Sequence, residues 1–135
     1  MTKKEAVQIL AILKAAYPSS YNGMTKEEAS GTVGIWAMQF ESMPVDIVMM
    51  AVQKLIATNK FPPTIAEVKD KIKAIHWEAY DFAHGWESEN LSEEARNKFR
   101  RIYEATNEYR HGRAYEPQLR QMLAFGELKQ IGNGE

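Results

Sequence analysis

Four segments in the N-terminal half of the chain carry apolar residues at the three- and four-residue spacing of an amphipathic helix. Residues spaced in this way line one face of a helix, and that face packs against a core. The pattern predicts helices over residues 3–17 and 25–40, a third from Pro44 to Asn59 and a fourth from Thr64. No segment alternates with the two-residue period of a strand, so we expect an all-α fold. The predicted core faces are Ile9, Ile12, Leu13, Ala16 and Tyr17, widened by Val7 and Leu10; Ala29, Val33, Trp36 and Phe40; Val45, Val48, Met49, Val52 and Ile56; and Ile65, Val68, Ile72 and Ile75.

Each of the four helices has a start signal in the sequence. In a T-x-x-E capping box, the two side chains accept hydrogen bonds from each other's backbone N–H groups at the first helical turn. The third helix begins instead at Pro44, whose fixed φ suits the first helical position. Pro18 ends the first helix after Tyr17. The capping box occurs three times, as Thr2 with Glu5, Thr25 with Glu28, and Thr64 with Glu67.

The sharpest break in the helical pattern is at residues 61–68, with the sequence Phe-Pro-Pro-Thr-Ile-Ala-Glu-Val. Pro62 and Pro63 fix φ and remove two backbone donors, so a helix cannot continue through them. We interpret the stretch as a rigid corner before the fourth helix, with Phe61 tucked into the core. Its residues are expected to hold the scaffold.

The C-terminal part of the chain contains two further candidate helices. Residues 80–90 are aromatic, acidic and interrupted by Gly85, which predicts either a linker or an extension of the fourth helix. Ser92 is suited to cap a helix that we predict over residues 92–110. A last, short helix is predicted over residues 117–129.

Charge divides the chain near the same point. All nine basic residues within residues 1–79 are lysines, whereas all six arginines lie between Arg96 and Arg120. Residues 74–95 hold six carboxylates and no lysine or arginine. We therefore predict a helical N-terminal domain over residues 1–79, a compact bundle of about four short helices, and a charged, partly helical C-terminal region over residues 80–135. The sequence leaves open whether that region is flexible.

The overall composition excludes several classes of protein. The chain has 135 residues, of which 44% are apolar, enough for one modest core. Cysteine is absent, which excludes disulfides and thiol chemistry and fits a reducing compartment. The net charge of −1 provides no overall field for nucleic acid or anionic lipid. There is no apolar leader and no apolar run long enough for a membrane helix, so we expect a soluble, cytoplasmic protein with no membrane partner.

No motif for catalysis or nucleotide binding is present. The chain lacks G-x-x-x-x-G-K-[ST], G-x-G-x-x-G and G-x-S-x-G, so we expect neither ATP use nor a cofactor. His76 and Glu78 form H-x-E, but a zinc deaminase would also need a pair of cysteine ligands. Glu93 with Glu94, or His76 with His84, could form a metal or acid–base pair; we favour a solvated acidic face and interfacial histidines. We predict that the protein is not an enzyme.

Basic and aromatic residues interleave between Arg96 and Tyr115. Such a surface can bind phosphates and stack on bases. Apolar residues of the segment nevertheless have core spacing, and Glu104 and Glu108 are placed to pair with arginines one turn earlier, so we favour a salt-bridged helix. The candidates for contact with nucleic acid or a partner are Arg96, Lys98, Arg100, Arg101, Tyr109 and Arg110.

A third interpretation is protein recognition, which we favour for residues 113–125. Amphipathic segments present anchors at i, i+3, i+4 and i+7 to a groove on a partner, and Arg, Tyr, Met and Phe are enriched at protein interfaces. The candidate partner-binding residues are Arg113, Tyr115, Leu119, Arg120, Met122, Leu123 and Phe125.

A first helix ending in Tyr17 and Pro18, a second built on Trp36, a third starting at Pro44 and the run at residues 61–68 form one pattern. This pattern resembles the small replicative helicase loader/inhibitor proteins of phages and prophages of Gram-positive bacteria. The resemblance covers about residues 2–78. The residues that carry it are Tyr17, Pro18, Trp36, Pro44, Phe61, Pro62, Pro63, Thr64 and Glu67.

The resemblance implies a compact helical N-terminal domain and a flexible, charged C-terminal region that engages the hexameric DnaB-type replicative helicase. Proteins of that family hold the helicase inactive and deliver it to an origin-bound initiator protein, without ATPase activity of their own. The missing phosphate-loop motif agrees with this and differs from an AAA+ type loader. Residues 80–135 lie outside the resemblance, and their two predicted helices are more structured than a disordered tail would be.

Two functional hypotheses follow. In the first, the protein is an adaptor in the cytoplasm of the bacterial host that binds the helicase through residues 96–128, with residues 1–79 as a scaffold or initiator-binding module and no direct DNA contact expected. In the alternative, it is a small DNA-binding replication or regulatory module. Its arginine-rich segment 96–113 would then contact phosphates, and Tyr103, Tyr109 or Trp86 would stack on bases.

Overall fold

The computed structural model describes residues 1–109. Within them it contains five α-helices, three short 3-10 helices and no strand, which confirms the predicted all-α fold. The predicted helix over residues 117–129 lies outside the described residues. The elements are α1 (Lys3–Ala16), η1 (Pro18–Tyr21), α2 (Lys26–Gln39), α3 (Val45–Ile56), α4 (Ile65–His84), η2 (Trp86–Asn90), α5 (Glu93–Ala105) and η3 (Asn107–Tyr109).

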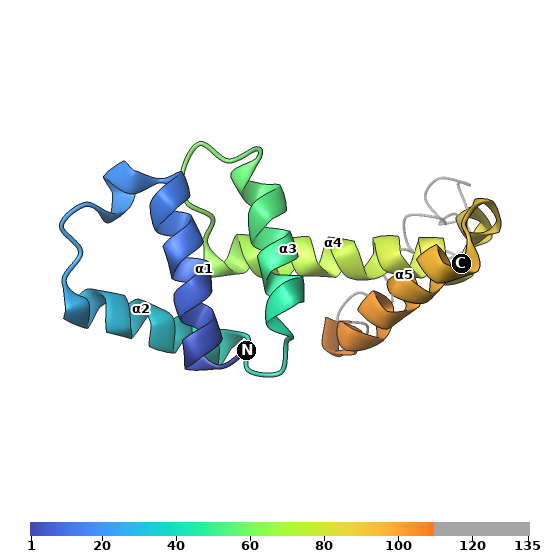
Figure 1. The fold of residues 1–135 in the computed structure, drawn as a ribbon, viewed down its shortest axis with the longest axis horizontal. Helices are drawn as coiled ribbons and strands as arrows, with labels where there is room; N and C mark the ends of the chain where they lie inside the picture. Colours follow the sequence, from blue (N-terminus) through green and yellow to red (C-terminus); the bar gives the residue numbers. More distant parts are fainter. Residues whose placement is uncertain (110–135) are drawn as a thin grey trace, which may run out of the picture.

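Helices α1, α2 and α3 pack together with the first half of α4 (Figure 1). The 20-residue helix α4 runs on beyond this bundle, and α5 returns antiparallel along its C-terminal half. The chain comes back far enough for Tyr109, at the end of η3, to join the main core. The described residues therefore form a bundle extended by an α4–α5 hairpin.

All three predicted capping boxes are present. In each, the threonine Oγ1 accepts a hydrogen bond from the glutamate N–H at 3.0 to 3.1 Å, and the glutamate carboxylate accepts one from the threonine N–H. Pro44 is the N-cap residue of α3, one position before the helical start that the sequence predicted. Ser92 caps α5 as predicted, because its Oγ accepts a hydrogen bond from the N–H of Ala95 at 3.1 Å.

Helix α4 continues to His84, so residues 80–84 extend the fourth helix instead of forming a linker. Gly85 ends it, and its N–H donates to the carbonyl of Asp81 at 3.0 Å. A Cβ atom at Gly85 would lie 2.7 Å from that carbonyl oxygen, so a larger residue does not fit this turn without a shift of the backbone. The sharp turn positions η2 and α5 for the return along α4.

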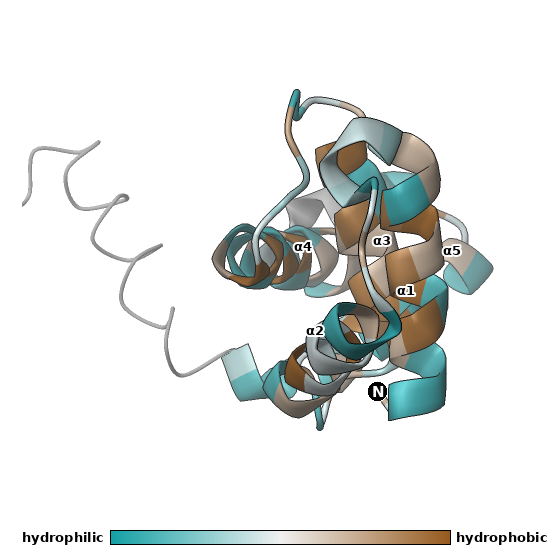
Figure 2. Cartoon of the chain, turned by 90° about the vertical axis from the view of Figure 1, so that its left-hand side faces the viewer, coloured by the Kyte–Doolittle hydropathy of each residue, from teal (hydrophilic) through white to brown (hydrophobic). Residues whose placement is uncertain are grey.

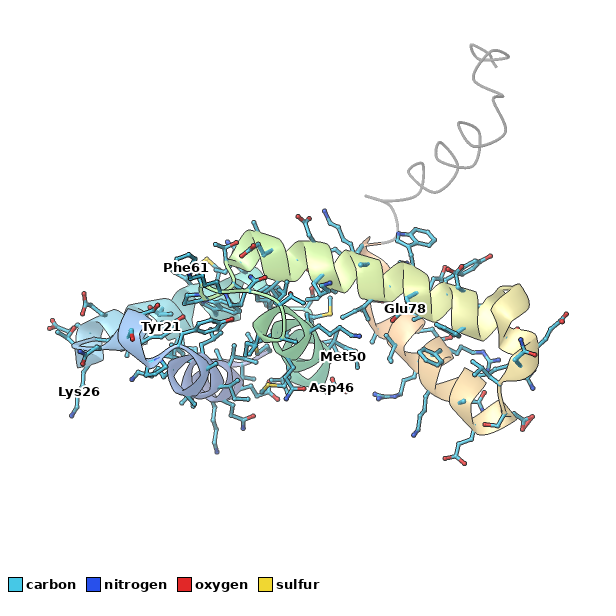
Figure 3. All side chains as sticks on the ribbon, turned by 90° about the horizontal axis from the view of Figure 1, so that it is seen from above. Tyr21, Lys26, Asp46, Met50, Phe61 and Glu78 are labelled. Atoms are coloured by element: carbon cyan, nitrogen blue, oxygen red, sulfur yellow. The ribbon has the colours of Figure 1, made fainter. Side chains whose placement is uncertain are left out.

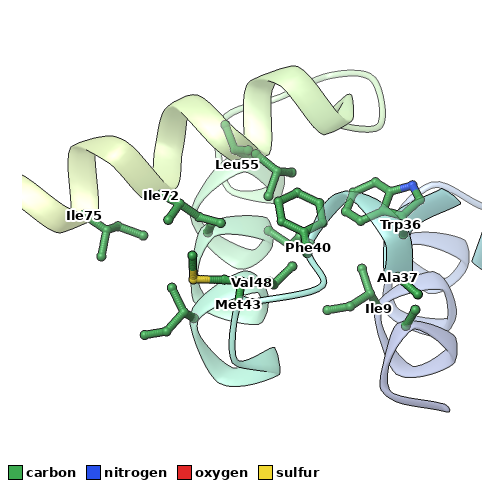
Figure 4. Close-up of a cluster of buried hydrophobic side chains, with 14 of the residues drawn as sticks. Ile9, Trp36, Ala37, Phe40, Met43, Val48, Leu55, Ile72 and Ile75 are labelled. Atoms are coloured by element: carbon green, nitrogen blue, oxygen red, sulfur yellow. The ribbon is translucent and has the colours of Figure 1, made fainter. Parts of the chain in front are cut away.

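The core lies where α1, α2, α3 and α4 meet (Figure 4). The hydrophilic first turns of α1 and α2 lie on the outside, whereas apolar residues of α1 and α3 gather where the helices meet (Figure 2). The predicted faces supply most of this core, and the structure adds positions between them, mainly on α3. The largest fully buried apolar side chains are Phe40, Ile9, Leu13, Met43, Ile47, Ile72, Val48, Val52 and Val68.

Candidate partner-binding surface

The corner at residues 61–68 joins three helix ends through polar contacts. The hydroxyl of Tyr17, at the end of α1, donates to the carbonyl of Asn59 at 2.9 Å. The side-chain amide of Asn59 lies 3.5 Å from Oε1 of Glu67, which also accepts the N–H of Thr64 at 2.9 Å. The end of α1, the segment after α3 and the start of α4 are thus tied together.

Phe61 is not tucked into the core, contrary to the sequence interpretation. Its side chain is 70% exposed in the loop that precedes α4 (Figure 3), and the Lys60 ammonium lies 5.8 Å from its ring centroid. The buried position at this corner is taken by Pro63. Because Pro62 and Pro63 hold the chain extended, burial of Pro63 leaves Phe61 outside the bundle.

Trp36 and Phe40 bring α2 into contact with the start of α4. Their ring centroids are 5.6 Å apart, and the ammonium of Lys69 on α4 lies 5.9 Å from the ring centroid of Phe40. Lys69 also donates to Oε1 of Gln39 at 2.7 Å. Trp36, predicted from its spacing as a core residue, is buried.

The basic residues of α5 differ in exposure. Arg96 and Arg100 are partly buried, whereas Lys98 and Arg101 are exposed. Nη2 of Arg101 lies 3.6 Å from Oδ2 of Asp46 on α3, and Arg100 donates to the side chain of Asn97.

The salt bridges predicted between these arginines and Glu104 or Glu108 are absent from residues 1–109. Glu108 instead accepts a hydrogen bond from Ser42 in the loop between α2 and α3. The side chains of α5 thus form contacts with the helical bundle in place of the predicted contacts along their own helix.

Two tyrosines that could have stacked on bases are used inside the fold. The ring of Tyr103 stacks on His76 of α4, with centroids 4.6 Å apart. Tyr109, predicted to contact a partner, is buried in the main core, so its ring is covered. Burial, with a smaller contribution from the carboxylate of Glu108, raises the pKa of Tyr109 to about 12.

A buried hydrogen bond also connects α5 with α4. Nδ1 of His76 lies 2.7 Å from Oγ1 of Thr106, and both side chains are fully buried. The same hydroxyl donates to the carbonyl of Ile102 at 2.8 Å. Phe82 and Phe99 stack further along the interface, with centroids 4.8 Å apart. The interpretation of His76 as an interfacial histidine is confirmed.

Helices α1 and α2 also enclose an apolar groove, with a volume of about 400 Å³. Val7, predicted to widen the core face of α1, instead lies on this groove with 53% of its side chain exposed. The error arises because helical spacing places Val7 next to the buried stripe but does not show that α2 diverges from α1 beside it. The groove is lined by Val7, Leu10, Ala11 and Lys14 of α1 and by Ala29, Ser30 and Val33 of α2.

The family model for the N-terminal domain of the phage gene-39 protein matches residues 1–69, just over half of the chain. The chain belongs to this phage helicase loader/inhibitor family. The family is associated with binding and inhibiting the replicative helicase, and it is not known as an enzyme family. The predicted resemblance is therefore confirmed. No curated protein and no solved structure matches the chain significantly.

The match to the family domain ends at Lys69, in the second turn of α4. The rest of α4, α5 and η3 pack onto the matched part through the contacts of Arg101, Glu108 and Tyr109. The folded body therefore extends about forty residues past the family domain, to Tyr109. Sequence spacing alone could not show where α5 packs, because its apolar face is narrow and the remainder is charged.

The predicted helicase-contact residues lie outside the described residues, as does Arg110. No helix within residues 1–109 has the length and apolar character to cross a membrane. The same residues contain no cluster of three or more histidine, aspartate and glutamate side chains able to hold a metal ion. The predicted partner-contact residues outside the described part are Arg110, Arg113, Tyr115, Leu119, Arg120, Met122, Leu123 and Phe125.

Proposed function

We propose that this protein binds the hexameric replicative helicase of a bacterial host, holds it inactive and delivers it to an origin-bound initiator protein. The observation that carries the proposal is the match of residues 1–69 to the N-terminal domain of the helicase loader/inhibitor family. The family is associated with binding and inhibition of that helicase. Delivery to the initiator is the part of the proposal that goes furthest beyond this association.

We propose residues 113–125 as the helicase contact. The aromatic side chains of α5 and η3 that could anchor a partner are engaged internally: Phe99 stacks on Phe82, Tyr103 stacks on His76, and Tyr109 is buried. The apolar anchors of residues 113–125 are Leu119, Met122, Leu123 and Phe125, with Arg113 and Arg120 between or beside them. Such a set supports binding of one amphipathic face to a groove on the helicase.

Residues 1–79 would act as the scaffold or as the module that binds the initiator. The corner at Tyr17, Asn59 and Glu67 holds the helix ends in fixed relative positions. A rigid body joined to a separate helicase contact suits an adaptor, because the two partners can then be bound at different surfaces of one chain.

A helicase strand-displacement assay tests this function. The full-length protein is titrated into the host helicase on a forked DNA substrate, and unwinding is expected to fall to the background once the helicase is saturated. Adding the initiator protein on origin-containing DNA should restore unwinding of that template. Unchanged unwinding at a large molar excess of the protein would contradict helicase binding, and inhibition that the initiator does not relieve would contradict delivery.

The same assay separates helicase binding from DNA binding. A protein that competed for phosphates would inhibit in proportion to the DNA present, and its effect would fall steeply with salt. An adaptor would inhibit in proportion to the helicase, whatever the DNA concentration. The internal stacking of Tyr103 and burial of Tyr109 remove two of the three aromatic residues that the DNA-binding hypothesis required.

A further inference from the structure

The α1–α2 groove is a preformed surface. In Figure 1 the two helices meet at the N-terminal end of α1 and the C-terminal end of α2, and diverge from there. Leu10 and Val33 form its floor, and beneath them Leu13 and Trp36 border a space too narrow to admit a water molecule. Because the floor belongs to the packed core, the groove needs no rearrangement to exist.

Apolar side chains are exposed at this pair of helices. Among residues 1–109, five large apolar or aromatic side chains are exposed, and three of them (Val7, Ile35 and Met38) are on α1 and α2. No described residue covers Val7, although valine has a lower helix propensity than alanine and gains nothing in water. An apolar position of this kind, continuous with an apolar floor, suits contact with another molecule.

The charge at the groove is positive. Lys14 is its only charged lining residue, and within residues 1–109 no carboxylate lies within ion-pair distance of it. Lys26 extends outward from the free end of α2 (Figure 3). The nearby carboxylates of Glu5 and Glu28 already accept hydrogen bonds in their capping boxes. A partner with acidic groups would therefore be matched to this surface.

We propose that the α1–α2 groove binds an amphipathic helix of another protein, with apolar side chains on Val7, Leu10 and Val33 and a carboxylate beside Lys14. A groove open along its length suits a helix, because a small molecule would keep much of its surface in water there. The site is separate from residues 113–125, so it gives the chain a second protein partner, independent of the proposed helicase contact.

Selection of displayed peptides on the full-length protein tests this inference. The probe is a library of random peptides of roughly 15 residues, about four helical turns. We expect enriched peptides to carry apolar residues at i, i+3 or i+4, and i+7, with an excess of Asp and Glu over Lys and Arg. Val7→Asp should abolish their binding, because it places a charge on the groove floor beside the peptide's anchors.

Two further variants locate the contact. Met38→Asp is the matched control, because Met38 is 70% exposed on the opposite side of α2 from Ala29 by helical spacing, and it should bind the peptides as the unaltered protein does. Lys14→Glu should weaken the acidic peptides roughly five- to tenfold by turning an attraction into a repulsion. Circular dichroism of each variant establishes that it is folded.

The inference is overturned if no peptide is enriched, if the enriched peptides are basic or lack helical periodicity, or if they bind Val7→Asp as well as the unaltered protein. Self-association that Val7→Asp abolishes would also overturn it, since the groove would then hold a second copy of the chain. None of these results would affect helicase binding through residues 113–125, so failure of this inference can be told from failure of the proposed function.

Discussion

Tyr109 is the last described residue, and it joins the C-terminal segment to the main core. Its side chain is buried among residues of the helical bundle, while the neighbouring Glu108 accepts a hydrogen bond from Ser42. A residue predicted to face a partner therefore contributes to stability. Burial favours the neutral phenol over the phenolate, because an ionised group loses its hydration there.

Stability should fall in alkaline solution because of Tyr109. Burial raises its pKa from the ordinary value of 10.0 to about 12. In the unfolded chain the phenol ionises near its ordinary value, whereas in the folded protein it stays neutral up to the higher one. The stabilisation is complete below the lower value and is lost as the pH rises through the higher one. Urea unfolding from pH 8 to pH 12 measures this loss.

The variant Tyr109→Phe isolates that effect from the other groups that titrate in the same range. It keeps the ring and removes the ionisable hydroxyl, so its stability should decline less with pH than that of the unaltered protein. Identical pH profiles for the two proteins would contradict the burial of Tyr109.

The sequence predicted some single residues correctly and others wrongly for a physical reason. The capping boxes, such as Thr64 with Glu67, were predictable because both partners lie within one helical turn. The exposure of Phe61 and Val7 and the burial of Tyr109 depend on segments distant in sequence. Local periodicity carries no information on which neighbouring helix covers a given position.

At the level of elements, the α4–α5 hairpin is the main addition to the predicted fold. Its two helices were predictable separately, and the structure shows how they pair, through His76, Thr106 and the stacked rings of Phe82 and Phe99. The break at Gly85 was visible in the sequence, whereas the pairing was not, because the apolar face of α5 is narrow and could equally have faced a partner. Whether residues 80–135 form a separate domain remains a prediction.

Replacing Thr106 by valine should loosen this hairpin. The hydroxyl of Thr106 carries one hydrogen, which it donates to Ile102, so its oxygen accepts from Nδ1–H of His76. Valine keeps the side-chain volume but removes that partner from a buried nitrogen. The cost should be about 1–3 kcal/mol of unfolding free energy, measured by urea denaturation. Hydrogen exchange should show the loss of protection in α5.

Thr32→Val is the matched control for that change. The Thr32 hydroxyl makes the same kind of hydrogen bond, to the Glu28 carbonyl at 2.9 Å, but near the surface and without a histidine partner. Its replacement should cost less than about 0.5 kcal/mol. Equal losses for the two variants would show that the His76 contact contributes nothing beyond the hydroxyl's own helix bond.

For the whole molecule, family membership and the folded body have different limits. The family match covers residues 1–69, the described body reaches Tyr109, and the proposed helicase contact begins at Arg113. Fold class and family were predictable because they depend on helix periodicity, capping boxes and the corner at residues 61–68. The binding surfaces were harder to predict, since the α1–α2 groove arises only when two helices diverge.

The affinity of the full-length protein for the host replicative helicase tests the central claim most directly. Immobilised helicase hexamer is titrated with the unaltered protein, with a Leu123→Asp/Phe125→Asp double variant and with Met38→Asp as the control. The account predicts saturable binding of the unaltered protein and of Met38→Asp, and a loss of roughly thirtyfold or more for the double variant, as expected when central apolar anchors are removed. Absence of binding by the unaltered protein would contradict the function, and equal binding by the double variant would contradict the placement of the contact.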